Sequence, residues 1–161
     1  SAVTAQEEAE PMAPPPSEPF AAVLSGSVSF EPLAAPTEEC QAPVMTITDA
    51  AGSSTLGEIT LHTEHCPTTG LPTVPLGVQT MTTADGDELS SVYFVDCLPL
   101  MASAPEGEPM TCQGRLEFTG GTGRFAEATG SATEIAFIWF PGSLEIQGWP
   151  WIGKFEGSIS Y

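Results

Sequence analysis

The residues with the clearest potential for chemistry lie in the segment His62-Thr-Glu-His65-Cys66, where imidazole, carboxylate and thiol groups follow one another. Such groups are the usual ligands of zinc. The alternating pattern around them predicts a strand, and residues three apart on a strand point to opposite faces. His62 and His65 are therefore expected on opposite faces. His62 and Glu64 share a face, but two ligands do not make a metal site, so the pattern favours ordinary strand residues.

A second cluster, Asp85, Asp87 and Glu88, offers carboxylate oxygens that could bind Ca²⁺. The spacing of an EF-hand loop is absent, and Asp-Gly is a common pair in hairpin turns. The sequence therefore predicts a turn here, with a calcium site as the alternative.

Groups for covalent or acid–base catalysis are not evident in the sequence. It contains no G-x-S-x-G motif, and neither of its two histidines has an obvious partner. With 21 acidic residues, two carboxylates can come together by chance, so their presence does not predict a glycosidase. We therefore predict no catalytic residues, no cofactor and no metal, which makes the expected protein non-enzymatic.

An aromatic loop, residues 139–152, is the segment most suggestive of binding. Two tryptophans flank a proline in it, which is typical of a partner surface or the mouth of a ligand site. The alternative is a loop that folds back and plugs one end of a barrel. The predicted interaction surface combines this loop with the N-terminal tail and comprises Met12, Pro14, Pro15, Pro16, Trp139, Phe140, Trp149, Trp151 and Ile152.

The charge balance limits the possible partners. Against 21 acidic residues there are only three basic ones, Arg115, Arg124 and Lys154, and the net charge is −18. Such a surface repels phosphates, which argues against nucleic acids and anionic membranes. It favours solubility, or attraction to a cationic partner or a divalent ion. No apolar run approaches the roughly 18 residues of a membrane span.

The four cysteines, Cys40, Cys66, Cys97 and Cys112, predict disulfides and an oxidising compartment. Three pairings are possible. We favour Cys40–Cys66 with Cys97–Cys112, because each pair joins segments that neighbour one another in an antiparallel meander. A zinc site is the alternative, but no C-x₂-C spacing occurs. A first residue other than methionine is as expected after removal of a signal peptide, so we expect a secreted or cell-surface protein.

Residues 1–19 form an acidic, proline-rich tail that cannot bury apolar area and is typical of disordered or polyproline segments. If it is ordered, such a tail needs a surface to lie on. We expect it to lie on a neighbouring copy or a partner protein, with its own barrel as the alternative surface.

From residue 20 onward the sequence predicts strands. They are expected at 22–30, 43–48, 57–65, 78–83, 88–95, 114–119, 128–140 and 154–161. In the third, Ile59, Leu61 and Thr63 share one face, and glycines 120, 121 and 123 allow a tight turn after the sixth. Residues 20–161 are therefore predicted to form an all-β, eight-stranded, antiparallel closed barrel with short hairpins and an extended N-terminal tail. A two-sheet sandwich is the alternative.

The segment 134–140 of the predicted strand 128–140 is apolar on both faces, which is unusual for a strand with one face in water. We expect its outer face to be covered. The candidates are the segment Pro141–Gly153, the N-terminal tail or another subunit.

Four segments together resemble exported bacterial proteins with a barrel like that of allene oxide cyclase and dirigent proteins. Gly120–Gly130 is similar to the group's GGTGRFAGATG stretch, with Glu127 in place of a glycine. Ser54–Thr60 resembles ATHLGRFT, Ala84–Asp87 resembles ANGD, and Gly157–Tyr161 resembles GTISY. The resemblance covers roughly residues 20–161 and implies an eight-stranded barrel. It implies no catalytic residue in this chain.

These observations predict a non-enzymatic exported β-barrel with a structural or interaction role at the cell surface, as a subunit held in an assembly by its tail and aromatic loop. The alternative is a lipocalin-like or allene oxide cyclase-like barrel that binds an apolar small molecule. That function needs a cavity of about 300 Å³ or more, and a lumen closed by Phe118, Phe125, Phe137 and Phe155 would exclude it. A third possibility, an enzyme, would require a buried acid with a strongly shifted pKa in a cleft.

Overall fold

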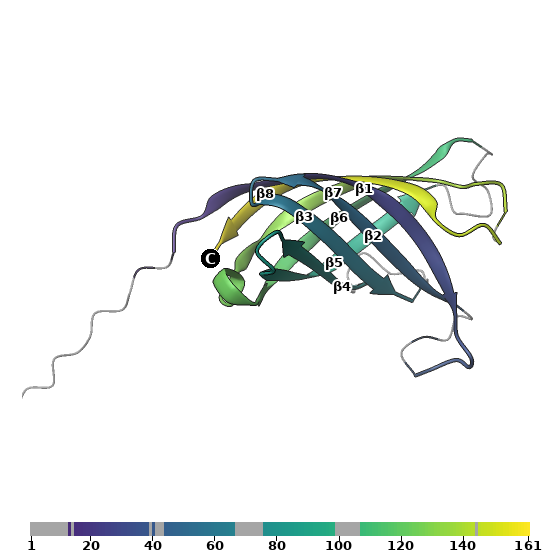
Figure 1. Cartoon of the computed structure of the whole chain (residues 1–161), viewed down its shortest axis with the longest axis horizontal. Coiled ribbons are helices and arrows are strands. Elements are labelled where there is room, and N and C mark those ends of the chain that lie inside the picture. The colour runs from purple at the N-terminus through teal and green to yellow at the C-terminus, as the bar shows by residue number, and fades with distance from the viewer. Residues whose placement is uncertain are drawn as a thin grey trace, which may run out of the picture.

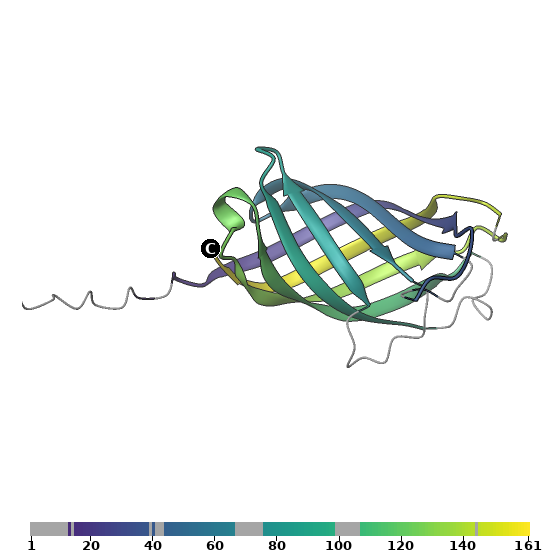
Figure 2. The same ribbon diagram turned by 90° about the horizontal axis from the view of Figure 1, so that it is seen from below.

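The computed structural model describes residues 13, 15–38, 40, 44–66, 76–98, 107–143 and 145–161, which form an antiparallel barrel of eight strands (Figures 1 and 2). The strands are β1 (Glu18–Pro32), β2 (Val44–Ser54), β3 (Gly57–His65), β4 (Gly77–Thr83), β5 (Glu88–Leu98), β6 (Pro109–Gly121), β7 (Thr129–Trp139) and β8 (Trp149–Ser160). No helix within these ranges is long and apolar enough to cross a membrane. The predicted closed barrel is confirmed, and the alternative sandwich is wrong.

Each strand pairs with the next one in sequence, and β1 pairs with β8 to close the cylinder. The side chains alternate between the lumen and the outside, as the strand period of two requires. In β3, for example, Ile59, Leu61 and Thr63 are buried while the residues between them are exposed. The predicted face of this strand is therefore the lumen face.

Several strands extend further than their sequence patterns indicate. β8 begins at Trp149 instead of Lys154, and β6 begins at Pro109 instead of Gly114. In the added part of β8, Trp149 and Trp151 face the lumen while Ile152 lies outside. Because both faces are apolar there, no alternation of apolar and polar residues marks the strand, and only the pairing with β1 and β7 identifies it.

The two ends of the barrel differ in their connections. At one end, which we call the turn end, short connections join β2 to β3, β4 to β5 and β6 to β7, and the C-terminus lies there (Figure 1). The four other connections meet at the opposite end, the loop end, and are longer. The core residues toward the turn end include Phe20, Leu24, Ile59, Met81, Leu89, Leu116, Phe118, Phe125, Phe155 and Ile159.

The glycine-rich segment closes the turn end. Gly120 and Gly123 have φ values of 105° and 54°, which glycine adopts without steric cost. They lead into a 3₁₀ turn, η2 (Gly123–Phe125), that places the ring of Phe125 fully inside the barrel. Gly121 is needed for a different reason, because a Cβ there would overlap the carbonyl oxygen of Glu88. The predicted turn is present, but Gly121 has no positive φ, and the connection spans residues 122–128 and contains the 3₁₀ turn.

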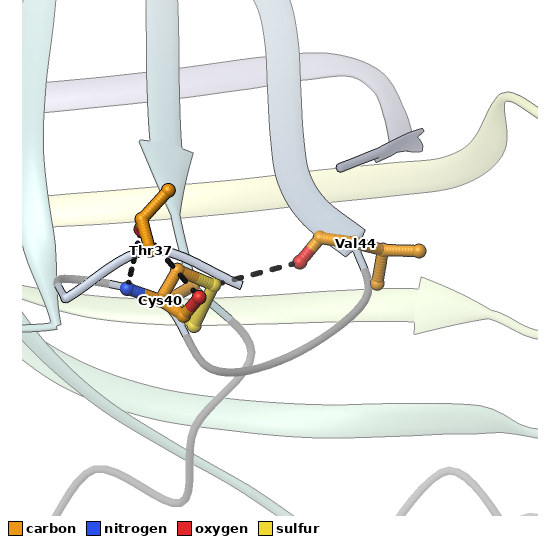
Figure 3. The surroundings of a disulfide bond; sticks show 4 residues. Thr37, Cys40 and Val44 are labelled. Atoms are coloured by element: carbon orange, nitrogen blue, oxygen red, sulfur yellow. Dashed lines mark hydrogen bonds between the residues drawn. A yellow bond between two sulfur atoms is a disulfide. The ribbon is translucent and has the colours of Figure 1, made fainter. Parts of the chain in front are cut away.

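Both favoured disulfides are present, Cys40–Cys66 and Cys97–Cys112. Cys97 and Cys112 are direct register partners on β5 and β6, with Cα atoms 4.0 Å apart. Cys40 lies in the connection between β1 and β2. Its backbone amide donates a hydrogen bond of 2.9 Å to Oγ1 of Thr37 (Figure 3). Two disulfides indicate that the protein folds in a non-reducing environment.

Candidate functional site

A cavity of about 310 Å³ lies inside the barrel, in the half toward the loop end. Every strand contributes to its wall. The lining residues are Val28, Phe30, Thr46, Thr48, Leu61, Thr63, His65, Leu76, Gln79, Tyr93, Val95, Asp96, Cys97, Met110, Cys112, Glu134, Ile138, Trp149 and Trp151. The wall is mainly apolar and aromatic, with a few polar side chains among them.

The barrel is hollow here because small side chains face the lumen. On β2 and β3 these are Thr46, Thr48 and Thr63, all of them buried. On β7 and β8, Ala136 and Gly153 occupy lumen positions, so they add little volume. In the turn half of the barrel, the rings of Phe20, Phe118, Phe125 and Phe155 are buried, and that half is packed.

The four phenylalanines expected to fill the lumen do not all face inward. Phe118, Phe125 and Phe155 are buried in the turn half. Phe137 is out of phase with Ala136 and Ile138, so its side chain lies on the outer face, where the ring centroid is 6.3 Å from that of Trp139. The lumen is therefore closed at one end only, and the condition that would have excluded a binding cavity is not met.

Glu134 carries the only carboxylate that is fully buried among the described residues. Its side chain faces the lumen and is 7% exposed, and Oε2 has no hydrogen-bond partner in the described structure. Burial penalises the charged form and raises the pKa of Glu134 to about 7. The carboxyl group can therefore change its charge near neutral pH.

Gln79 on β4 is a second buried polar group in the cavity wall. The residue is 2% exposed, and its Nε2 lacks a hydrogen-bond partner among the described residues. Its register partners, Thr63 and Ser91, also face the lumen. An unpaired buried donor of this kind costs about 1–3 kcal/mol unless water or a ligand satisfies it.

Tyr93 and His65 form a hydrogen-bonded pair in the same wall. The Tyr93 hydroxyl oxygen lies 2.6 Å from Nδ1 of His65, and the two rings meet edge to face. Burial lowers the pKa of His65 to about 4. Burial also raises the pKa of Tyr93, an effect that a hydrogen bond with Thr63 opposes. Both side chains are therefore neutral at pH 7, so the pair offers hydrogen bonds without charge.

Trp149 and Trp151, predicted as part of an interaction surface, lie inside the barrel. Trp149 is fully buried, its Nε1 donates a 2.7 Å hydrogen bond to the carbonyl oxygen of Ile146, and its ring contacts Phe30 and Phe140 edge-on. Trp151 lies flat along the wall over Gly153, where a Cβ would overlap its ring. Both lie in strand β8, so this part of the predicted loop is a strand and not a loop that folds back to plug the barrel end.

The rest of the predicted interaction surface is dispersed. Ile152 lies on the outer face and is 43% exposed, and Trp139 and Phe140 are partly buried. Pro15 and Pro16 are exposed, whereas Met12 and Pro14 lie outside the described residues. The predicted contact between the tail and another surface therefore stays a prediction.

The histidine and aspartate clusters lie outside the lumen, except for His65. His62 is on the outer face, opposite to His65 as predicted, and Nδ1 is 2.6 Å from Asp49 Oδ1. This hydrogen bond is the main cause that raises the pKa of His62. Asp87 faces Arg124 at the turn end, with Oδ2 3.4 Å from the Arg124 amide nitrogen. Within the described ranges, no group of three or more side chains is arranged to hold a metal ion.

The polar residues of the cavity were not predicted from the sequence, although the alternation of the strands indicates on which face they lie. His65 continues the face of Ile59, Leu61 and Thr63 by two residues, so the alternation alone places it in the lumen. Glu134 likewise shares its face with Ala132. The presence of a hollow around these side chains could not be inferred, because it depends on what lies across the barrel.

Comparison of the chain with family models, curated proteins and solved structures gives no match. A mainly apolar chamber with one buried carboxyl group, one unpaired amide and one neutral tyrosine–histidine pair is suited to holding and orienting a small molecule.

From the raised pKa of Glu134 we predict how the free energy of unfolding depends on pH. Its neutral form is favoured in the folded state, so the stability it confers is present below pH 4.5 and is lost as the pH rises to about 7. The loss corresponds to about 3 kcal/mol. Relative to the Glu134→Gln variant, the wild type should therefore become less stable over this pH range in urea unfolding. A constant difference between the two proteins from pH 4 to pH 8 would contradict the buried, unpaired carboxyl group.

Proposed function

We propose that this barrel binds a small, largely apolar molecule in the cavity of its loop half. The observation that carries the proposal is the cavity itself, with its volume of about 310 Å³ and its mainly apolar wall. Pockets for small organic ligands start at about 300 Å³ and combine apolar walls with a few polar groups. Eight-stranded barrels are just wide enough to hold one such ligand.

The polar groups of the wall support this function because they give a ligand a fixed orientation. Gln79 Nε2 and Glu134 Oε2 are buried and unpaired among the described residues. A ligand with polar atoms at one end would satisfy these groups, while its apolar body lies against Trp149 and Trp151. The two disulfides suit an exported binding protein, which must keep its barrel intact outside the cell.

The direct test is titration with N-phenyl-1-naphthylamine, an apolar, uncharged dye whose fluorescence rises in apolar sites. We expect saturable binding of one dye per chain in the micromolar range, which corresponds to about −8 kcal/mol. A linear, non-saturating response up to the solubility limit of the dye would refute the proposal.

A second candidate function is self-association through the outer face of β7 and β8. Ile135 and Ile152 are 46% and 43% exposed there, and Phe137 lies on the same outer face. Two of the three basic residues of the chain, Arg115 and Lys154, border this patch on β6 and β8. On this patch the electrostatic repulsion between two copies of an otherwise acidic chain is weakest among the described surfaces. Such a patch is what a subunit of an assembly would need.

If this face joins copies of the chain, exchanging both isoleucines for serine should dissociate them. We expect light scattering of the wild type at about 100 μM to give a multiple of the monomer mass, and the Ile135→Ser/Ile152→Ser variant to give the monomer mass. Val78→Ser is the matched control, because Val78 is 58% exposed on β4, away from the patch. A monomeric wild type would rule out this candidate function.

A further inference from the structure

We infer that the ligand of the lumen is an organic cation, an amine-bearing molecule with an apolar body whose ammonium group pairs with Glu134. This inference rests on the proposed binding function and specifies the chemical class of its ligand. It follows from the charges that face the cavity, from the groups left unpaired in its wall and from the aromatic rings around it.

Among the described residues, the carboxyl group of Glu134 faces no positive charge. Its register partners are Gly114 on β6 and Phe155 on β8, both uncharged. The other titratable residues that line the cavity are His65 on β3 and Tyr93 and Asp96 on β5, and none of them is a cation at neutral pH. A buried carboxylate is costly unless it is paired, so a cationic ligand would gain the interaction that the protein does not supply.

The basic residues of the chain are all elsewhere. Arg115 and Lys154 form ion pairs on the outer wall, with Glu117 and Glu156 respectively, and Arg124 lies at the turn end against Asp87. The cavity therefore contains an acid without its counter-ion, while the chain as a whole carries a net charge of −18. This field attracts organic cations toward the barrel and repels anions such as fatty acids.

The rest of the wall suits the body of such a molecule. The indole rings of Trp149 and Trp151 and the rings of Tyr93 and Phe30 line the same cavity. Aromatic faces attract ammonium groups and also pack well against apolar or aromatic frameworks. The unpaired Nε2 of Gln79 can donate to an oxygen of the ligand, so the best ligand has a hydroxyl, ether or carbonyl group besides its amine.

Three probes that differ only in their polar group test the inference. They are 1-naphthylmethylamine, 1-naphthalenemethanol and 1-naphthaleneacetic acid, whose binding is measured by calorimetry at about pH 8, above the Glu134 pKa of about 7. We expect the protonated amine to bind at least about tenfold more tightly than the alcohol, and the acid to bind most weakly. Equal affinities for the amine and the alcohol would overturn the inference while leaving the binding function in place.

Two variants separate a specific ion pair from the general effect of net charge. Glu134→Gln should lower the affinity for the amine by at least about tenfold and leave that for the alcohol within about twofold. Glu117→Gln removes one charge from the outer wall, where Glu117 is half-exposed, and should change neither affinity. If the amine keeps its advantage in Glu134→Gln, the inference is wrong. If neither the amine nor the alcohol binds the wild type, the proposed binding function is itself refuted.

The pH dependence gives an independent measurement on the wild type. Protons compete with the amine for Glu134, so the affinity for 1-naphthylmethylamine should fall as the pH decreases below about 7. The affinity for the alcohol should not follow this curve. Parallel pH dependence of both probes would count against pairing with Glu134.

Discussion

Replacing Thr46 and Thr48 by phenylalanine is expected to lower the affinity of the lumen for N-phenyl-1-naphthylamine by at least about a hundredfold, or about 3 kcal/mol. Both threonines are buried on β2 and line the cavity. Two rings in place of two small side chains would reduce a volume of about 310 Å³ to less than an organic ligand needs. Binding should be lost because space is lost, while every polar group of the wall remains.

The barrel should survive this change, since the new rings enter a hollow and not a packed core. Overpacking of a filled core costs about 1–3 kcal/mol, and less is expected here. The matched control is Thr60→Phe, because Thr60 faces outward on β3 and is exposed. That variant should bind the dye like the wild type. Unchanged dye binding by the folded double variant would show that the dye binds elsewhere.

Removing both disulfides is expected to cost about 6 kcal/mol of unfolding free energy, the largest effect on stability that we predict. The disulfide Cys40–Cys66 spans 26 residues and Cys97–Cys112 spans 15. On the chain-entropy model, loops of these lengths contribute about 3 kcal/mol or slightly more each. Since domains are stable by about 5–15 kcal/mol, the variant with four alanines should be marginally stable or unfolded.

Variants that lack only one disulfide compare the contribution of each disulfide to stability and to dye binding. Cys97 and Cys112 lie in the cavity wall on paired strands, so their removal should also weaken dye binding. Cys40 fastens the connection between β1 and β2 to the end of β3 and does not line the cavity, so its removal should affect stability more than binding. Urea unfolding with circular dichroism gives the free energies. A loss of less than about 1 kcal/mol for the four-alanine variant would contradict the entropic account.

The packed half and the hollow half of this barrel have different roles. Phe20, Phe118, Phe125 and Phe155 fill the turn half, where their burial supports the fold. The loop half lacks such burial and contains a chamber with polar groups that are unpaired among the described residues. This arrangement lowers stability, and in the proposed function it provides the binding site. Such a local conflict between packing and polarity is typical of functional sites.

The amino-acid sequence by itself predicted most of the strands, and it favoured the closed barrel and the disulfide pairing that the structure has. These features follow from local signals, namely the period-two alternation in segments such as β3, the glycine turn that leads to Phe125, and cysteines on neighbouring strands. Strand ends were less well determined where both faces are apolar, as at Trp149–Gly153 of β8. There the alternation disappears although the pairing continues.

Only the tertiary structure decided which lumen positions are filled and which remain hollow. Closing a barrel fixes which side chains meet across it, and that depends on the register of all eight strands together. For this reason Trp149 and Trp151 became part of an inner wall, and Glu134 acquired its shifted pKa. The local alternation predicts which face of the sheet a side chain occupies. The neighbours that surround the side chain on that face come from strands distant in sequence.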